Sequence, residues 1–286
     1  MSWTVLLSGL ELGVELALIA LGMAWVMSIL KFLNFAHGDL ISLGAYATYW
    51  LRLQTHWPFA LCVALSAVIV GIAGVLIERV AYRPLRQRRL SMFLCSVGVS
   101  LMLNAALGLS FGPQARVFDY TPPQFGLGGS VVSALDAALL LLLVVVLLGS
   151  AWMLQRTQVG AAIRAVSENA QAVALLGISV DGLVSLTFFI SAALAAVCGS
   201  MLGLAGTLHP DMGFRYMIWA FAVIVLAGFG SIRGIAVTGL LTGILISAII
   251  AILHTYDYVN VVLFGLMTLM LVFLPEGVFG MRLRRV

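Results

Sequence analysis

The chain has 286 residues, of which 63% are hydrophobic and 9% are charged, and its net charge is +4. Soluble globular domains carry about 25% charged residues, so this composition excludes that class. Apolar runs of about 20 residues, the length that a helix needs to cross a ~30 Å hydrocarbon layer, recur along the whole sequence. The residues in these runs do not alternate with a period of two, as they would in a β-barrel. We therefore predict an all-α, polytopic membrane protein.

The predicted spans, about eight or nine in number, form a single transmembrane domain over residues 1–286. In chain order they cover 5–30, 38–53, 59–80, 92–112, 134–154, 183–206, 215–230, 235–253 and 258–274. The first span is too long for the core of a signal peptide and has no basic region before it, so we expect it in the mature chain. The three cysteines lie inside apolar runs, at spacings that suit neither a metal nor a disulfide framework. They are Cys62, Cys95 and Cys198.

The basic residues predict the orientation of the chain. They gather at 79–89, at 156–164 and in the tail at 282–285. With nine spans all three clusters fall on one side, which the excess of arginine marks as cytoplasmic. The C-terminus is then cytoplasmic, whereas the N-terminus and the loops at 113–133 and 207–214 face outward. The loop at 113–133 is rich in proline and glycine and is expected to be irregular rather than another span.

A polar stretch follows the first span. LNFAHGDLISLGAY (33–46) places Asn34, His37 and Asp39 within six positions of an otherwise apolar region. Polar side chains at membrane depth are costly and are tolerated where they are buried in protein or line a wet cavity. Two roles stay open for Asn34 and His37. They face a polar pathway, or they satisfy backbone groups that a break in the helix has freed.

We expect this break near residues 33–38. The run from Asp39 to Leu51 is too short to cross the bilayer alone at 1.5 Å per residue. Irregular backbone at that depth is found only where it lines a cavity or is buried in protein. Gly38 is expected to supply the bend.

The segment at 155–177 predicts a short amphipathic helix on the inner side. Its apolar stripe comprises Val159, Ile163, Val166, Ala170 and Val173. Its polar stripe comprises Arg164, Glu168 and Gln171. Arg164 and Glu168 have the i,i+4 spacing of an ion pair, and the helix should end near Gly177. Such a helix either docks on a partner or lies along the lipid headgroups.

Glycines are concentrated in LAGFGSIRGIAVTGLLTG (226–243). They are Gly228, Gly230, Gly234, Gly239 and Gly243. The sequence predicts a helix break at Ser231–Gly234, and Gly239 and Gly243 have the small-xxx-small spacing of closely crossed membrane helices. We interpret these glycines as packing residues rather than as a ligand site.

Seven segments, taken together, resemble a known family. They are LNFAHGDLISLGAY (33–46), ERVAYRPLR (78–86), FGPQARVF (111–118), AIRAVSENAQAVALLGIS (162–179), HPDMGF (209–214), GFGSIRG (228–234) and LPEGVFG (274–280). In order and spacing they resemble the branched-chain amino-acid ABC transporter permeases, specifically the H-type subunit. The resemblance extends through nearly the whole chain.

The resemblance implies the role of the chain and its partners. It implies the permease subunit of a bacterial ABC importer, a multi-pass protein of the inner (plasma) membrane. The expected partners are a second permease chain in a paralogous heterodimer, two cytoplasmic ATPase subunits and a periplasmic or extracellular substrate-binding protein. ATP and Mg²⁺ are used by the ATPase subunits, so this chain is expected to bind no cofactor, no metal and no nucleic acid, and to be no enzyme.

The resemblance also implies site residues. The helix at 160–177 becomes a coupling helix that lies in a groove of an ATPase subunit, through Gly160, Arg164, Glu168, Leu176 and Gly177. The translocation pathway is expected near the interface of the two permease subunits, at Asn34, His37, Gly38 and Asp39. The five glycines of 226–243 are expected to serve helix packing and gating.

The sequence departs from the family pattern at several positions, and this bears on the substrate. Arg233 stands where proline is usual, Ala227 replaces a common glycine, and Ser42 replaces a frequent methionine. Leu274 and Glu276 take places that arginine and glutamine often hold. The expected cargo is a branched-chain or other hydrophobic amino acid, with urea and short amides as the alternatives that related permeases carry.

An ion-coupled secondary transporter is the alternative function. Glu11 and Glu15 lie one turn apart on the first span, and ionisable residues inside a membrane are functional candidates by default. Together with His37 they would carry protons or sodium ions, and glycine-broken helices suit such a transporter. The amphipathic inner helix suits it less well, because a self-sufficient transporter needs no docking element.

Overall fold

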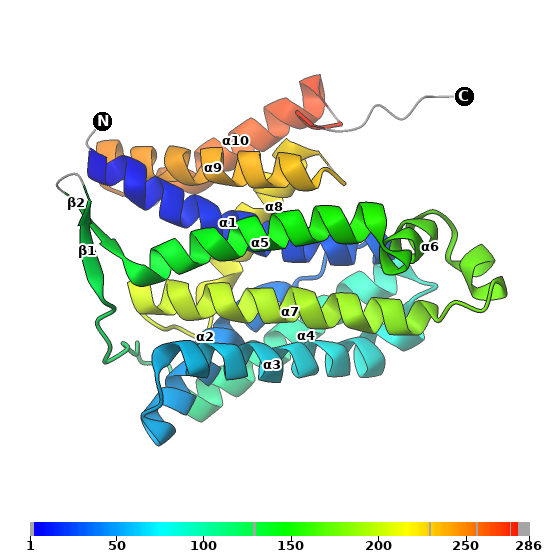
Figure 1. Cartoon of the computed structure of the whole chain (residues 1–286), viewed down its shortest axis with the longest axis horizontal. Helices are drawn as coiled ribbons and strands as arrows, with labels where there is room; N and C mark the ends of the chain where they lie inside the picture. The colour runs from blue at the N-terminus through cyan, green and yellow to red at the C-terminus, as the bar shows by residue number, and fades with distance from the viewer. Residues whose placement is uncertain (1–2, 128–129, 229, 256, 275, 280–286) are drawn as a thin grey trace. The chain divides into compact units, whose positions relative to one another are not determined.

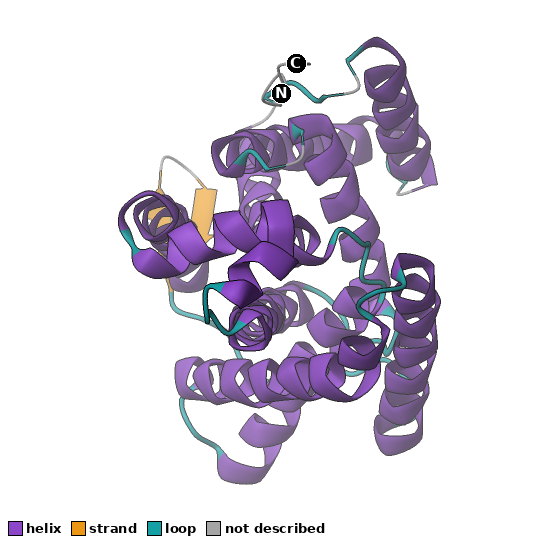
Figure 2. Ribbon diagram, turned by 90° about the vertical axis from the view of Figure 1, so that its right-hand side faces the viewer, coloured by secondary structure: helices purple, strands orange, loops and turns teal. Residues whose placement is uncertain are grey.

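The chain is almost entirely helical in the computed structural model (Figure 2). The structure describes residues 3–127, 130–228, 230–255, 257–274 and 276–279. Its helices are α1 (Trp3–Leu30), α2 (Ala36–Thr55), α3 (Phe59–Ile77), α4 (Arg89–Phe111), α5 (Ala134–Arg156), α6 (Gln158–Leu175), α7 (Val180–Ala205), α8 (Met212–Ala227), α9 (Ile232–Leu253) and α10 (Asp257–Phe273). A π-helical turn, η1 (Glu78–Tyr82), and a 3₁₀ turn, η2 (Arg83–Leu85), follow α3.

Each of the nine predicted spans corresponds to one helix, α1 to α5 and α7 to α10 (Figure 1). Among the described residues, α1, α4, α7 and α9 are long and apolar enough to cross a membrane, as is α3 taken together with η1 and η2 (Phe59–Leu85). The pair α5–α6 passes the same test as a bent unit, while α8 and residues Tyr258–Phe273 of α10 form shorter apolar helices. The prediction of an all-α, polytopic membrane fold is confirmed.

The chain forms two compact units. One comprises Met1–Ala24, Thr121–Ala151 and Ile218–Val286, and the other comprises Trp25–Tyr120 and Trp152–Met217. We call the first the α9 unit and the second the α2 unit, after a helix that lies wholly within each. The helix break, the η1 turn and α6 all belong to the α2 unit.

Helix α2 contacts α3, α4 and α7 within the α2 unit. Glycines bring α2 and α7 together backbone to backbone. A Cβ atom on Gly44 would lie 2.2 Å from the Cα of Ala196, and one on Gly199 would lie 2.0 Å from the carbonyl oxygen of Ile41. Small residues allow this kind of approach between membrane helices. Neither position accepts a side chain unless a backbone moves.

Short hydroxyl side chains connect the same helices. The hydroxyls of Thr48 on α2 and Ser200 on α7 lie 2.8 Å apart, and the Ser66 hydroxyl on α3 donates to the carbonyl oxygen of Gly44 at 2.8 Å. All three side chains are buried. Interhelical hydrogen bonds in membranes contribute about 1 kcal/mol each. Together with the glycine contacts they hold α2, α3 and α7 as one closely packed group.

The α9 unit contains a second glycine contact, between α1 and α9 (Figure 1). A Cβ on Gly239 would lie 2.7 Å from the Cβ of Ala17, and one on Gly243 would lie 2.2 Å from the backbone nitrogen of Gly13. Both predicted small-xxx-small residues therefore lie directly against α1.

The prediction of irregular structure throughout 113–133 is wrong for its second half. Residues Gln124–Leu127 (β1) and Ser130–Ser133 (β2) form an antiparallel pair, with Leu127 opposite Ser130 (Figure 2). In the sequence two glycines separate these strands, which is a spacing typical of a β-hairpin. The proline and glycine content that we took as irregular structure belongs in part to this hairpin.

Loops that the charge pattern assigns to one side of the membrane meet in the α2 unit. The backbone nitrogen of Arg116 donates to the carbonyl of Leu208 at 3.1 Å, and that of Leu208 donates back at 2.8 Å. These residues belong to the two loops predicted to face outward. Their pairing agrees with a shared side for both loops.

Candidate functional site

The predicted break in the helix is present between α1 and α2, at residues 31–35. Helix α1 ends at Leu30, and α2 begins at Ala36. The chain leaves α1 through Lys31, whose φ of +56° lies in the left-handed region that side chains other than glycine rarely adopt. The change of direction therefore takes place at a lysine.

Gly38 does not supply the bend, contrary to the prediction. It lies in the first turn of α2, where a Cβ would approach the Cα of Phe214 to 3.1 Å. A Cβ on Gly213 would lie 2.0 Å from the carbonyl oxygen of Gly38, and the Gly213 amide donates to the Ser42 hydroxyl at 3.0 Å. Glycine is therefore needed at position 38 because the start of α8 lies too close for a side chain. It is not needed there for an unusual backbone conformation.

The polar side chains around the break are buried within the α2 unit. Asn34 is 3% exposed, His37 1% and Asp39 2%. The hydroxyl of Tyr82 donates to Oδ1 of Asn34 at 2.8 Å, and the hydroxyl of Ser100 on α4 donates to a carboxylate oxygen of Asp39. These contacts connect Asn34 to η1 and Asp39 to α4, and the role of Asn34 and His37 in satisfying freed backbone groups stays a prediction. A role in the translocation pathway stays a prediction.

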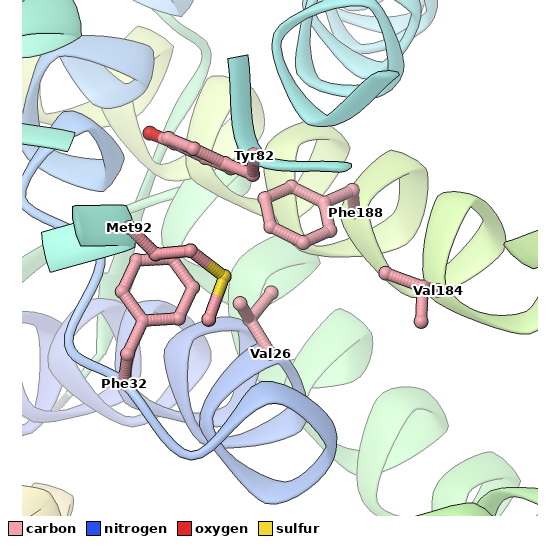
Figure 3. Close-up of a cluster of buried hydrophobic side chains, with 6 residues drawn as sticks. All are labelled: Val26, Phe32, Tyr82, Met92, Val184 and Phe188. Carbon is pink, nitrogen blue, oxygen red and sulfur yellow. The ribbon is translucent and has the colours of Figure 1, made fainter. Parts of the chain in front are cut away.

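Tyr82 belongs to a cluster of buried side chains beside the break. The cluster comprises Val26, Phe32, Tyr82, Met92, Val184 and Phe188 (Figure 3). The Tyr82 ring packs edge-on against Phe32, with centroids 5.5 Å apart, and lies 5.7 Å from the ring of Phe188 on α7. The end of α1, the break, the η1 turn, α4 and α7 thus share one apolar core.

A group of charged residues that we did not predict from the sequence lies beside this core. Glu78, the first residue of η1, is fully buried and accepts a hydrogen bond from the Ser185 hydroxyl of α7 at 2.7 Å. Arg86 forms ion pairs with Glu78 and with Asp181, and Arg83 forms another with Asp181. We call these five residues the Glu78 cluster.

A signal for the Glu78 cluster exists in the sequence. Glu78 directly follows the apolar run 59–77 and precedes a set of arginines, which we interpreted only as a charged loop. An acidic residue at the end of a span needs a cationic partner if it is buried, and Arg86 is within reach. Asp181 and Ser185 lie about 100 residues later, and no local pattern links them to Glu78.

The predicted cytoplasmic helix is present as α6. It begins after Thr157, whose side chain accepts a hydrogen bond from the Gly160 backbone nitrogen at 3.1 Å, a typical N-cap. Val166 and Val173 of the apolar stripe are buried. The helix ends at Leu175, and Gly177 has a φ of +77°. Leu175 and Leu176 at this end are 90% and 78% exposed, so an apolar surface remains there.

Helix α6 differs from the prediction in two details. It is kinked at Asn169, whose backbone leaves the helical region and whose Oδ1 caps a second segment by accepting from the Ala172 nitrogen at 3.0 Å. Asparagine competes with the helix backbone in this way. Arg164 and Glu168, both of which lie in the described part of α6, do not form the predicted ion pair with each other.

The glycine-rich segment before α9 adopts the backbone shape that glycine permits. Gly228 and Gly230 have φ values of +93° and +90°. A Cβ on Gly234, at the start of α9, would lie 2.7 Å from the Cβ of Phe279. The break predicted at Ser231–Gly234 is present only at Ser231, since α9 begins at Ile232 and the Ser231 hydroxyl caps it by accepting from the Gly234 nitrogen at 3.1 Å. A gating role of this segment stays a prediction.

Comparison with known proteins identifies the family. The family described as branched-chain amino acid transport system / permease component matches residues 5–272. The chain belongs to this family. It is 35% identical to the high-affinity branched-chain amino acid transport system permease protein BraD of Pseudomonas aeruginosa, over 96% of this chain and 94% of that protein. It is 33% identical to LivH of Escherichia coli K12, over the same shares. No solved structure matches the chain significantly.

Membership in the permease-component family confirms the resemblance drawn from the sequence motifs. Residues 5–272 include the helix break, the Glu78 cluster and α6, so all three are parts of the permease itself. The chain is therefore a permease component of a transport system and a multi-pass membrane protein.

Proposed function

We propose that this chain is the membrane-spanning permease subunit of a bacterial ABC importer for branched-chain amino acids. The observation that carries the proposal is the match of residues 5–272 to a family of transport permeases. The subunit would lie in the inner membrane beside a second, paralogous permease chain. Two cytoplasmic ATPase subunits would bind and hydrolyse ATP with Mg²⁺, and an external binding protein would deliver the substrate.

Helix α6 is the proposed contact with the ATPase. It is amphipathic, its buried valines hold it to its own subunit, and its exposed Leu175 and Leu176 offer an apolar surface to a partner. Closure of the ATPase subunits would push this helix and move the α2 unit as a largely rigid body. Gly160, Arg164, Glu168, Leu176 and Gly177 are the residues that we assign to this contact. This assignment places α6 and the C-terminus on the cytoplasmic side.

The translocation pathway is proposed to pass the break between α1 and α2, at Asn34, His37, Gly38 and Asp39. A polar, broken helix within an apolar chain is the kind of element that lines a passage in transporters. The relatives BraD and LivH are named as permeases of high-affinity branched-chain amino acid transport systems. We therefore propose leucine-type amino acids, rather than urea or short amides, as the cargo.

Uptake into liposomes tests this function. The liposomes would contain this chain with its co-purified partners, and labelled leucine, urea or acetamide would be added outside with the binding protein. We expect leucine uptake that requires both internal ATP and the binding protein. Uptake driven by a proton or sodium gradient with this chain alone would overturn the importer and favour an ion-coupled transporter that uses Glu11, Glu15 or His37.

His37→Ala is expected to lower the initial rate of leucine uptake about tenfold while the ATPase subunits still co-purify. His37 is buried at the break, so its removal alters the proposed pathway without touching α6. The matched control is Ser66→Ala, which removes another buried polar group from the same unit, one that bonds to Gly44 within α2 and not to the break. Unchanged uptake in His37→Ala would mean that His37 serves only the packing of the break.

A further inference from the structure

The η1 turn is an unusual element at the end of α3. It is π-helical, whereas α1 to α10 are α-helices, of which α6 is interrupted by the kink at Asn169. Single π-helical turns are rare and occur frequently at functional sites. Two side chains of this turn, Glu78 and Tyr82, are fully buried and point to different parts of the α2 unit. Each makes a specific polar contact there.

Tyr82 contacts the helix break. Its hydroxyl donates to Oδ1 of Asn34 at 2.8 Å, and its ring packs edge-on against Phe32. Figure 3 shows Tyr82 at the upper edge of the buried cluster, with Phe188 below it on one side and Phe32 below it on the other. Phe32 and Asn34, two of the five residues of the break, therefore both contact the side chain of Tyr82.

Glu78 contacts the beginning of α7. It accepts from Ser185 directly, and Arg86 bridges it to Asp181 in the first turn of α7. Four residues, 176–179, separate α7 from the end of α6. They include Gly177 and the N-cap Ser179, which accepts from the Gly182 nitrogen at 3.2 Å. The start of α7 is thus fixed to η1 on one side and follows α6 closely on the other.

We propose that the η1 turn is a positioning element that transmits movement of the α6–α7 junction to the break between α1 and α2. The first link is the ion pair of Asp181 with Arg86 and Arg83, the second is Arg86 with Glu78, and the third is the hydrogen bond from Tyr82 to Asn34. This inference rests on the proposed function, because it takes movement of α6 by an ATPase as its source. Glu78 and Tyr82 lie on the same turn, so a shift of one carries the other.

The test changes one link at each end. Tyr82→Phe keeps the ring in the cluster and removes only the hydroxyl that holds Asn34. Asp181→Asn keeps the size of the side chain and removes the charge that holds Arg83 and Arg86. Asp181 is half exposed, so this second variant is expected to fold even if the buried change at Tyr82 impairs insertion.

Two matched controls are available in the same unit. Tyr46→Phe removes the hydroxyl of another buried tyrosine, one that has no hydrogen-bond partner among the described residues. Arg79→Gln removes an exposed arginine from the same η1 turn, outside the Glu78 cluster. Asp181→Glu, which keeps the charge, is the conservative variant.

The readout is the number of leucine molecules transported per ATP hydrolysed, in liposomes that contain the permease with its partners and the binding protein. We expect Tyr82→Phe and Asp181→Asn to lower this ratio at least threefold, while Asp181→Glu, Tyr46→Phe and Arg79→Gln keep it. A purely structural loss would lower uptake and hydrolysis in proportion and leave the ratio unchanged.

The proposal would be overturned if either Tyr82→Phe or Asp181→Asn left the number of leucine molecules transported per ATP unchanged. It would also be overturned if the control variants lowered this number as much as Tyr82→Phe and Asp181→Asn do. Failure of the proposed function is distinguishable, because the wild-type chain would then show no uptake that depends on ATP and the binding protein.

Discussion

Gly199→Ala will strongly destabilise this protein, although it adds only one methyl group. The added Cβ would lie 2.0 Å from the carbonyl oxygen of Ile41 and 2.8 Å from its carbon. Both are backbone atoms of α2, so the overlap cannot be relieved by rotating a side chain. Overpacking of a closed core costs about 1–3 kcal/mol and occasionally more, and a clash with backbone belongs at the upper end.

The measurement is the thermal unfolding midpoint of the purified protein in detergent, with Gly98→Ala as the control. Gly98 lies on α4 in the same unit and has no atom within 4 Å of a Cβ built on it. Alanine also favours helix over glycine by about 1 kcal/mol, so the control should unfold at the same temperature or higher. Equal midpoints for the two variants would contradict the close contact of α2 and α7.

Gly177→Val is the substitution with the largest expected effect on transport. Gly177 has a φ of +77°, and no atom lies within 4 Å of a Cβ built there. The expected strain is therefore in the backbone, where a left-handed residue other than glycine costs about 1–2 kcal/mol and a β-branched one more. We expect the end of α6 to change direction, and leucine uptake to fall more than tenfold with the chain still inserted in the membrane.

Gly177→Asn is the matched variant, since asparagine tolerates the left-handed conformation. It should retain most of the uptake and should co-purify with the ATPase subunits in normal amount. Loss of uptake in both variants would indicate that lack of a side chain, rather than backbone conformation, matters at position 177. Normal uptake and normal ATPase co-purification in Gly177→Val would show that the junction between α6 and α7 is not a coupling element.

The spans could be predicted from the sequence because lipid imposes a simple rule on the chain. Backbone groups in hydrocarbon must be satisfied within the segment itself, so long apolar runs become helices. The predicted span at 183–206 and the observed α7, Val180–Ala205, differ by three residues at one end and one at the other. The small-xxx-small spacing likewise predicted a close helix contact at Gly239, and the structure shows that its partner is α1.

The details of the breaks could not be predicted, because they depend on residues far away in the sequence. The bend that we assigned to Gly38 lies at Lys31, and glycine is needed at position 38 because it contacts Gly213, 175 positions later. The kink at Asn169 depends on a local side-chain hydrogen bond that competes with a good helix pattern.

The contacts of the candidate site could not be predicted either, because they too join residues that are far apart in the sequence. Asn34 was singled out as a polar residue within an apolar region, but the residue that bonds its side chain, Tyr82, lies 48 positions away. Glu78 was overlooked because arginines surround it, a composition that is typical of a solvated inner loop. Burial turns the same residues into an ion-pair cluster that joins η1 to α7.

The polar content of α2 has a consequence for the order in which the protein is made. This helix carries Asp39 and Arg52, each of which opposes release from the translocon into lipid as a single segment. The helix that it contacts through Gly44 and Gly199, α7, begins about 125 residues after α2 ends. At ribosomal rates of about 5–20 residues per second, α2 waits on the order of 10 s for that neighbour. We expect nascent chains truncated before α7 to leave α2 loosely inserted and open to proteolysis, and chains extended past Ala205 to protect it.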